Sequence, residues 1–381
     1  MSEVLFIDGS LRSSPREIGG KAFGLNRMTA LGLPVPPAFV LPVSVHQEYR
    51  RCGTLTPAIR RALRRGIACL EDATGRAFRS GPAPLSLSVR SGAPHSMPGM
   101  MDTVLGVGAP DGHRDPWTHL IAAVTEVFDS WDNDRARLYR KSLRIAETGT
   151  AAVVQAMVYG DHPGFSGTGV LCTQDPTGTG KGPCGEWLPG RRGEALVSGT
   201  ATPLPLGALA AQEPGLHGRL LMAGSVLEQT AGRPQEIEFT VENGVLWLLQ
   251  TRALRIAERP SAMASSAAVL ARGTGACPGR ATGHTTADVG EAVARSAGGT
   301  PVVLVRPTTD PADLRGVLAS VAVVTETGGI TSHAAVVARE LAIPCVVGCG
   351  PGTTRQLTGR LVTVDGTHGL VLATHHEGER P

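Results

Sequence analysis

The sequence has few aromatic residues and no long apolar segment. Aromatic side chains make up only 4% of the 381 residues. No apolar run approaches the ~20 residues that a membrane helix needs. The first residues, MSEVLFIDGSLRSS, lack the basic start and apolar core of a secretory signal. We therefore expect a cytoplasmic protein without a membrane partner.

Cysteine is also scarce, since the seven cysteines are odd in number and scattered along the chain. Cys345 and Cys349 lie in the apolar stretch PCVVGCG, which favours a buried structural role over metal binding. Scattered cysteines of this kind are typical of a reduced, cytoplasmic protein.

A strong charge of one sign is missing as well, because the net charge is only +3. The densest basic cluster joins Arg60 and Arg61 to Arg64 and Arg65, at the spacing of one helix face. This cluster indicates a solvated helix face, and nothing else in the chain suggests a nucleic-acid partner.

The composition is that of a loop-rich α/β (α+β) enzyme, with 41% hydrophobic residues, 49 glycines and 28 prolines. Residues 1–150 mix apolar and basic segments, and residues 151–252 predict strands in VVQAMVYG, GTGVLCT, ALVSGT and EIEFTVENGVLWLLQTR. In the last of these, Asn243 and Gly244 predict the turn of a hairpin. Residues 253–272, rich in Ala and Ser, predict a linker that is partly helical.

The pattern changes after the linker. The segments PVVLV and VAVVT predict buried strands, and TSHAAVVARELAI predicts a helix with Thr331 or Ser332 at its N-cap. VTVDGTHGLVLA predicts a closing hairpin. We expect residues 273–374 to form a compact domain with a mixed sheet, followed by a frayed tail at 375–381.

The segment ETGGITSHAA (326–335) places a histidine in the first turn of this helix, behind a glycine pair. The positive end of the helix disfavours an imidazolium, so we expect the ring of His333 to stay neutral and nucleophilic. The same backbone N–H groups would stabilise a phosphate on the ring. Gly328 and Gly329 would let the backbone approach that phosphate closely.

This segment, with VVARELAIPCVVGCG after it, resembles the phosphohistidine domain of the pyruvate phosphate dikinase and phosphoenolpyruvate synthase family. The resemblance runs from Gly275 to about Leu372, and the phosphorylated histidine falls on His333. One position departs from it, because dikinases carry an arginine where this chain has Thr327, preceded by Glu326. Enzyme I of the bacterial sugar phosphotransferase system also lacks that arginine, so phosphorylation can survive its loss.

The N-terminal region carries phosphate-binding patterns of its own. The segment GGKAFGL (19–25) places Lys21 after a glycine pair at a predicted helix start, where the side chain can act as a point charge on phosphates. SVRSGA (88–93) ends an apolar strand near Arg90, and SMPGMMDT (96–103) supplies a mobile loop suited to a lid. An ordinary helix junction and an ordinary turn are the structural alternatives.

These strings resemble the ATP-grasp-like nucleotide domain of the same family, as do SWDNDRARLYR around Arg135, QAMV (155–158) and GEALVSGTATP (193–203). The resemblance implies that ATP contacts the following residues: Lys21, Arg90, Gly99, Met100, Met101, Asp102, Thr103, Arg135, Gln155, Met157, Val158, Glu194, Gln250 and Arg252.

The segments EIEF (236–239) and QTR (250–252) predict a Mg²⁺ site. Glu236 and Glu238 share one face of a strand, so their carboxylates would repel unless a cation joins them. The resemblance to the family's D-I-E-F and Q-T-R implies that Glu236, Glu238 and Gln250 are the ligands, with Glu236 in place of the usual aspartate. An exposed hairpin with ordinary carboxylates is the structural alternative.

The resemblance thus implies an ATP-grasp-like nucleotide-binding domain at 1–252, with subdomains of about 1–150 and 151–252, and a swivelling β/β/α phosphohistidine domain at 273–374. The resemblance implies that His333 would receive a pyrophosphoryl group from ATP, with AMP released. Dikinases continue into a (β/α)8 barrel that binds pyruvate, and the sequence lacks that segment. We therefore expect the chain alone not to complete pyruvate phosphorylation.

Three functions stay open at this point. In the first, the chain is an ATP-dependent phosphotransferase that passes phosphate from His333 to an unidentified small molecule. In the second, it is a phosphocarrier or regulatory component that passes phosphate to a separate partner protein. A nucleotide-binding pseudoenzyme is the third, and the presence of His333, Lys21, Arg90 and Glu238 argues against it. Both productive functions need His333 to travel, with residues 253–272 as the hinge.

Overall fold

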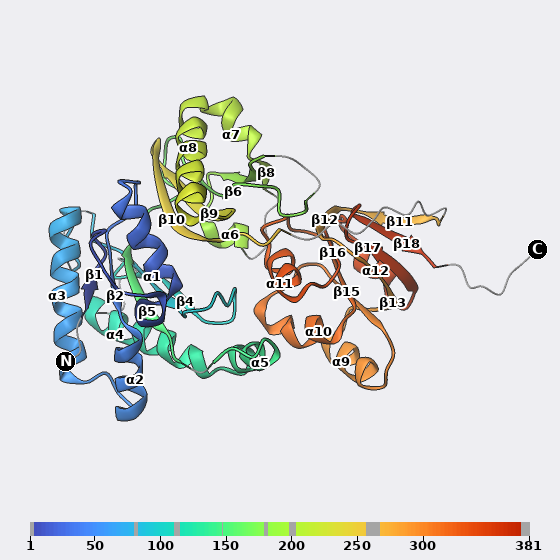
Figure 1. The fold of residues 1–381 in the computed structure, drawn as a ribbon, viewed down its shortest axis with the longest axis horizontal. Coiled ribbons are helices and arrows are strands. Elements are labelled where there is room, and N and C mark those ends of the chain that lie inside the picture. The colour runs from blue at the N-terminus through green and yellow to red at the C-terminus, as the bar shows by residue number, and fades with distance from the viewer. Residues whose placement is uncertain are drawn as a thin grey trace, which may run out of the picture. The chain divides into compact units, whose positions relative to one another are not determined.

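The computed structural model describes residues 4–79, 83–109, 115–146, 148–178, 182–197, 203–256 and 267–374. The chain divides into two compact units (Figure 1). Unit 1 comprises Met1–Tyr159 with Ile237–Arg252, and unit 2 comprises Gly160–Glu236 with Ala253–Pro381. The chain therefore passes from one unit to the other after residues 159, 236 and 252.

Unit 1 contains a five-stranded antiparallel sheet of order β1-β2-β5-β3-β4. In that order the strands are Leu5–Phe6, Ala38–Leu41, Ala151–Ala156, Leu87–Gly92 and Thr103–Val107. The helices of this unit are α1 (Pro15–Ala30), α2 (Val43–Cys52), α3 (Pro57–Thr74), α4 (Pro116–Asp129) and α5 (Asp134–Ser142), with a short 3₁₀ turn at Ser130–Asp132.

Helix α3 shows why these segments fold together. Its apolar residues Ile59, Leu63, Ile67 and Leu70 repeat at helical spacing and enter the same core cluster as the sheet. Gly66 lies so close to the ring of Phe39 that an added Cβ would fall 2.7 Å from it. The four arginines at positions 60, 61, 64 and 65 are exposed on the other face, which confirms the predicted solvated helix face.

The predicted hairpin is confirmed. Strand β9 (Gln235–Glu242) and strand β10 (Val245–Ala253) flank Asn243 and Gly244, which have φ values of 51° and 78°. Two successive residues with positive φ form the tight turn that matches the twist of a hairpin. Gln250 and Arg252 alternate with Thr251 along β10, so both point to one face.

The first part of unit 2 contains the antiparallel neighbours β6 (Gly167–Cys172), β7 (Cys184–Pro189) and β8 (Leu204–Pro205). Helices α6 (Gly193–Val197), α7 (Gly207–Gln212) and α8 (Pro214–Ala231) accompany them. The prediction of a strand in ALVSGT is wrong at its start, because residues 193–197 form α6. Residues 198–202 lie outside the described part of the chain.

The second part of unit 2 contains an eight-stranded sheet of order β11-β18-β17-β13-β14-β15-β16-β12. In that order the strands are Val269–Arg272, Leu370–Ala373, Leu361–Asp365, Arg280–Thr286, Val302–Arg306, Ala322–Thr325, Cys345–Val347 and Thr274–Cys277. The neighbours from β13 to β16 are parallel and the other pairs are antiparallel, which confirms the predicted mixed sheet. Its helices are α9 (Val289–Ala297), α10 (Leu314–Ala319), α11 (His333–Leu341) and α12 (Thr353–Leu357), with a 3₁₀ turn at Pro311–Asp313.

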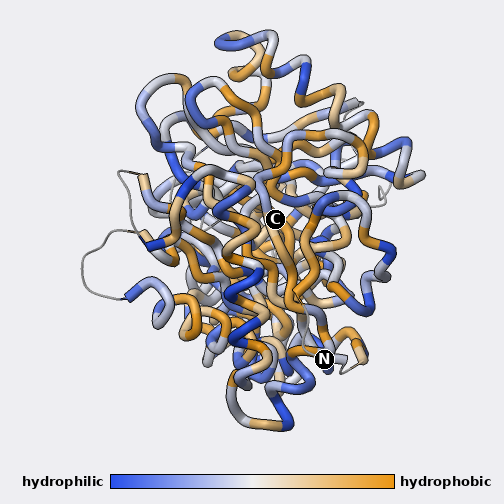
Figure 2. The backbone as a smooth tube through the Cα atoms, turned by 90° about the vertical axis from the view of Figure 1, so that its left-hand side faces the viewer, coloured by the Kyte–Doolittle hydropathy of each residue, from blue (hydrophilic) through white to orange (hydrophobic). Residues whose placement is uncertain are grey.

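Strand β11 occupies the last four residues of the predicted linker 253–272. Residues 257–266 of that linker and the whole predicted tail 375–381 lie outside the described residues. Along most of the chain, hydrophobic and hydrophilic residues alternate over short stretches (Figure 2). Among the described helices, none is long and apolar enough to cross a membrane.

Candidate active site

Arg90 is the centre of a charged cluster in unit 1. It lies on β3, and its guanidinium donates from Nη2 to Glu238 Oε2 at 2.9 Å and to Gln250 Oε1 at 3.1 Å. Its Nη1 donates to the backbone carbonyl of Leu249 at 3.1 Å. The structure therefore brings together the predicted phosphate clamp Arg90, the second predicted carboxylate Glu238 and the predicted amide ligand Gln250.

Lys21 joins this cluster through the glycine pair before it. Gly19 interrupts α1 with a φ of 78°, and the helix continues from Gly20. An added Cβ at Gly19 would lie 1.8 Å from the carbonyl oxygen of Gly92, and the N–H of Gly20 donates to the carbonyl of Ala93 at 2.9 Å. The lysine therefore starts a helical segment that is held against the end of β3, as the sequence predicts.

The electrostatics of Lys21 show how crowded with positive charge this cluster is. Burial and the neighbouring charges of Arg90 and Arg252 lower the pKa of Lys21 to about 7, although Glu238 opposes them. Burial alone would raise the pKa of Glu238, yet Arg90, Lys21 and Arg252 outweigh it and lower that pKa. Three basic side chains thus surround one ionised carboxylate, and a polyanion would relieve their mutual repulsion.

The oxygen atoms around Arg90 are of the type that binds Mg²⁺. Glu238 Oε2 and Gln250 Oε1 both accept a hydrogen bond from the same guanidinium nitrogen, so two oxygen atoms that could bind a cation lie close together. Hard divalent cations take carboxylate and amide oxygens as ligands. In the described part of the chain, no group of three or more His, Cys, Asp or Glu side chains is arranged to hold a metal. A cation here would therefore depend on the amide and on phosphate oxygens as well.

Arg135 holds the Gly/Met loop. Its Nε donates to the carbonyl of Met100 at 3.1 Å, and its Nη2 forms an ion pair with Asp102. Asn133, which caps α5, donates to the same carbonyl at 3.1 Å. Met100 is fully buried and Gly99 has a φ of 71°, so this loop has a defined conformation.

Thr103 connects the loop to the Arg90 cluster. It begins β4 and is the direct cross-strand neighbour of Arg90. Met101 and Asp102, which precede it, are half-buried. The predicted lid is therefore the segment that joins the strand of the phosphate clamp to its neighbour.

Four further residues that are predicted to contact ATP lie in or after β5. Gln155 is buried in β5 and donates from Nε2 to the carbonyl of Pro36 at 3.1 Å. Met157 Sδ accepts from the N–H of Gly106 at 3.0 Å, and Val158 beside it is half-buried. Glu194, in unit 2, is exposed in the first turn of α6. Their contacts with a nucleotide stay predictions.

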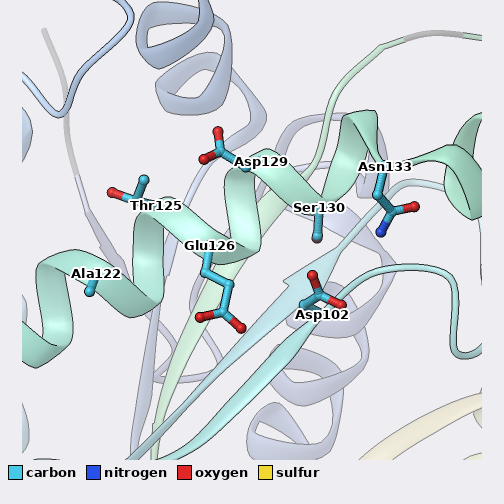
Figure 3. A pocket seen from close by; sticks show the side chains of 7 residues that line it. All are labelled: Asp102, Ala122, Thr125, Glu126, Asp129, Ser130 and Asn133. Carbon is cyan, nitrogen blue, oxygen red and sulfur yellow. The ribbon is translucent and has the colours of Figure 1, made fainter.

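An acidic hollow of about 530 Å³ lies beside the loop (Figure 3). Asp102, Glu126, Asp129 and Asn133 line it, together with Ala122, Thr125 and Ser130. Asp102 is the only predicted ATP-binding residue among them. Because the charged residues in its lining are all acidic, the hollow disfavours polyphosphate, and the basic cluster around Arg90 is the better phosphate site.

His333 is the first residue of α11, with Ser332 at the N-cap, which confirms the predicted helix. The side chain is only 8% exposed. Ser332 Oγ donates to the carbonyl of Gly329 at 2.8 Å, and Gly328 has a φ of 99°. The histidine therefore stands at a helix N-terminus behind a glycine turn, where backbone N–H groups favour a bound anion.

Glu186 on β7 is the residue that the sequence analysis missed. Thr331 donates its hydroxyl to Glu186 Oε2, and the backbone N–H groups of Ile330 and Thr331 also interact with the carboxylate. An added Cβ at Gly329 would fall 1.7 Å from Glu186 Oε1, so glycine makes this close approach possible. Burial raises the pKa of Glu186, and the hydrogen bonds only partly oppose that shift.

A carboxylate therefore occupies the anion-binding side of the loop before His333. The sequence offered one signal for it, since Glu186 is the only charged residue of the strand segment CGEWLP. A lone carboxylate in an otherwise apolar strand indicates a specific partner, but not which one.

Arg339 fixes the other side of the same loop. It is buried near the end of α11 and donates from Nη1 to the carbonyls of Ile330 at 2.7 Å and Ala276 at 3.2 Å. Its Nη2 lies 4.0 Å from a carboxylate oxygen of Glu236, which is buried in β9. Glu236 therefore faces a cation in unit 2, and its predicted role as a Mg²⁺ ligand stays a prediction.

Thr327, which departs from the family pattern, and Glu326 before it have defined contacts. The carboxylate of Glu326 accepts from the N–H of Thr354 at 2.8 Å. Burial opposes the ionised form of this group, but the hydrogen bonds from Thr354 and Gly352 prevail and lower the pKa of Glu326. Thr327 Oγ1 donates to the carbonyl of Pro307 at 3.0 Å. Both side chains stabilise the loop conformation.

Two segments of the chain match known protein families. Residues 63–206 match the family described as pyruvate phosphate dikinase, AMP/ATP-binding domain. Residues 298–369 match the family described as PEP-utilising enzyme, mobile domain. The first match includes β3, the Gly/Met loop and β7, and the second includes α11 with His333.

Several similar proteins are named pyruvate, phosphate dikinase. A pyruvate, phosphate dikinase of Rhizobium meliloti is 32% identical, with 98% of this chain and 57% of that protein covered. One of Clostridium symbiosum is 31% identical, covering 87% of this chain and 52% of that protein. A chloroplastic enzyme of Zea mays is 32% identical, covering 93% and 50%. This chain spans about half the length of the relatives it matches.

Proposed function

Because this chain belongs to the pyruvate phosphate dikinase family through its ATP-binding and mobile domains, we propose that it is an ATP-dependent phosphotransferase. In this proposal His333 takes phosphate from ATP and passes it to a small-molecule acceptor. The observation that carries the proposal is the cluster in which Lys21, Arg90 and Arg252 surround Glu238. Their excess positive charge is the environment that a polyphosphate requires.

The basic cluster would bind and orient the phosphates of ATP. Arg90 offers a planar fork of donors, and Lys21 offers a compact charge that a phosphate would keep protonated. Charge that develops on the transferred group would meet side chains that are already in position, which lowers the barrier without reorganisation. The loop at 99–103, held by Arg135, would cover the phosphates and exclude water.

Glu238 and Gln250 would hold Mg²⁺, with Glu236, two residues before Glu238 on the same strand, as the third predicted ligand. The ion would neutralise phosphate charge and align the phosphates for in-line transfer. When phosphates and the cation bind, Arg90 would exchange its present contacts with Glu238 and Gln250 for phosphate oxygens.

His333 would act as the nucleophile. A ring nitrogen would form a bond to phosphorus while the bond between phosphorus and the leaving oxygen of the nucleotide breaks. A neutral imidazole has a free lone pair and needs no general base for this step. Protonation of the phosphorylated ring would later make it a good leaving group for the acceptor. The transfer requires that the nucleotide and His333 meet during the reaction.

Mass spectrometry of the protein after incubation with Mg²⁺ and ATP tests this proposal. We expect an acid-labile phosphate on His333, and His333→Ala as the control should carry none. AMP as the released nucleotide would identify pyrophosphoryl transfer, and ADP would identify transfer of the terminal phosphoryl group. An intact protein that binds Mg²⁺-ATP but never becomes labelled would refute the proposal.

The identity of the acceptor is tested by measuring how fast phosphorylated His333 loses its phosphate. Fast turnover of ATP with a small molecule would identify the acceptor class. Slow turnover alone, accelerated by a separate protein, would instead favour a phosphocarrier that serves a partner protein. These outcomes exclude one another, because each requires a different species to remove phosphate from labelled His333.

A further inference from the structure

The structure brings four of the scattered cysteines into two cross-strand pairs. Cys172 on β6 lies directly opposite Cys184 on β7, and Cys277 on β12 lies directly opposite Cys345 on β16. Both pairs join antiparallel strands, and all four cysteines carry free thiols. Opposed residues of antiparallel strands have Cβ atoms about 4.5–5.5 Å apart, and a disulfide needs about 3.5–4.5 Å, so a small approach of the two strands would allow the bond.

The two pairs differ in the environment of their sulfur atoms. The thiols of Cys172 and Cys184 are hydrogen-bonded to each other, and this bond lowers the pKa of Cys184 while it raises that of Cys172. Burial, Asp175 and Glu186 oppose the lowering of the pKa of Cys184, whereas Arg339 supports it. In the second pair, burial raises the pKa of Cys277 to about 11 and raises that of Cys345 further.

Access also differs between the pairs. Cys184 is half-buried at the end of its strand. Cys277 and Cys345 are both buried. A small oxidant can therefore reach the half-buried Cys184 of the first pair, whereas both sulfurs of the second pair are shielded by burial.

We propose that Cys172 and Cys184 form a reversible disulfide across β6 and β7, with a low-molecular-weight disulfide as the oxidant. The Cys184 thiolate attacks one sulfur of the oxidant and releases a thiolate, which takes up the proton that Cys184 lost on ionisation. The sulfur of Cys172 then attacks Cys184 in this mixed disulfide, and its proton goes to the second departing thiol. Two protein thiols are oxidised and one disulfide is reduced, so atoms and electrons balance.

The full-length protein in glutathione buffers of graded redox potential tests this site. After alkylation of free thiols, peptide mass spectrometry should find Cys172 joined to Cys184, with dithiothreitol restoring both thiols. Cys277 and Cys345 should stay free. The exposed cysteines Cys52 and Cys69 show whether the buffer oxidises thiols, because they should form glutathione adducts.

Two variants separate the roles of the sulfurs. Cys172→Ser removes the resolving thiol, so the glutathione adduct should accumulate on Cys184. Cys184→Ser should leave Cys172 free, since the buried thiol lacks the partner that reacts first. If Cys172 and Cys184 both remain free while Cys52 and Cys69 are modified, or if Cys277 and Cys345 are oxidised first, the proposal fails.

The disulfide would also reach the loop before His333, and this consequence rests on the proposed function. Cys184 and Glu186 lie two residues apart on one face of β7, and Glu186 accepts from Thr331. A disulfide that fixes β7 to β6 would restrict the position of Glu186 and change its contact with the loop before His333. Oxidation should therefore change the rate of His333 labelling at least twofold in the native protein, but not in Cys184→Ser.

The outcomes of this second test are distinct. Equal rates for the oxidised and reduced native protein would overturn the coupling. Absence of labelling in the reduced protein would instead refute the proposed function, and mass spectrometry would still decide whether the disulfide forms.

Discussion

Two glycine pairs precede the two residues on which the proposed reaction depends, and they are held in different ways. Gly19 before Lys21 packs against the backbone carbonyl of Gly92, whereas Gly329 before His333 packs against the side chain of Glu186. A backbone contact cannot move without moving the sheet. A carboxylate can rotate away. The lysine is thus fixed in place, whereas the histidine loop has a contact that it can exchange for another anion.

The largest effect is expected for Gly19→Ala, which tests whether the contact of Gly19 with the backbone of Gly92 fixes Lys21 in place. Its Cβ would meet a backbone oxygen at 1.8 Å and its φ of 78° disfavours side chains, so we expect a loss of about 4 kcal/mol or more in the free energy of unfolding. Urea denaturation measures this loss. Gly32→Ala is the matched control, because Gly32 has a φ of 69° but nothing within 4 Å of an added Cβ. Equal losses in the two variants would show that packing against Gly92 does not hold Lys21.

The second largest effect is expected at Arg90, whose positive charge lies near that of Lys21. Arg90→Met removes three hydrogen bonds at the cluster, so His333 labelling by Mg²⁺-ATP should slow by about 10²–10³-fold. Single-turnover kinetics give this rate. Arg64→Met, on the exposed face of α3, should leave it unchanged. A native rate in Arg90→Met would move the phosphate site away from this cluster.

A smaller effect is expected at the second glycine pair. Gly329→Ala places a Cβ 1.7 Å from Glu186 Oε1, but the carboxylate can rotate, so the free energy of unfolding should fall by only about 1–2 kcal/mol. Combined with Glu186→Ala, the substitution at Gly329 should cost much less. A double-mutant cycle measures this coupling. Additive losses would contradict the contact between Glu186 and the loop.

The smallest effect is the pH dependence of ATP binding. Lys21, facing Arg90, Arg252 and Glu238, has its pKa lowered to about 7, and bound phosphates would raise that pKa again. Binding then takes up a proton above pH 7, so affinity should fall with rising pH, by up to about tenfold per unit. Calorimetry in buffers of different ionisation enthalpy measures the uptake. Lys21→Met should abolish it, and an unchanged pH dependence in that variant would assign the proton to another group.

Local sequence patterns sufficed where neighbouring residues decide the conformation. Asn243 and Gly244 set the hairpin turn, the glycine pairs set the starts of the helices at Lys21 and His333, and alternating apolar runs set the mixed sheet. The segment ALVSGT shows the limit, because its apolar residues suit either a strand or a helix. Short apolar runs do not distinguish the two.

Local sequence patterns were enough to identify the reactive side chains and the backbone that carries them: Lys21 and His333 each behind glycines, Arg90 on a strand, and the β9–β10 hairpin. The predicted end of that strand at Arg90 is wrong, because β3 continues to Gly92. Only the folded structure shows which distant residues meet. Glu186 reaches Thr331 across 145 positions of the chain, and Cys172 meets Cys184 only because strand register places them opposite each other. Local propensity acts over a few residues, whereas sheet register and burial fix contacts between segments that carry no trace of each other in sequence.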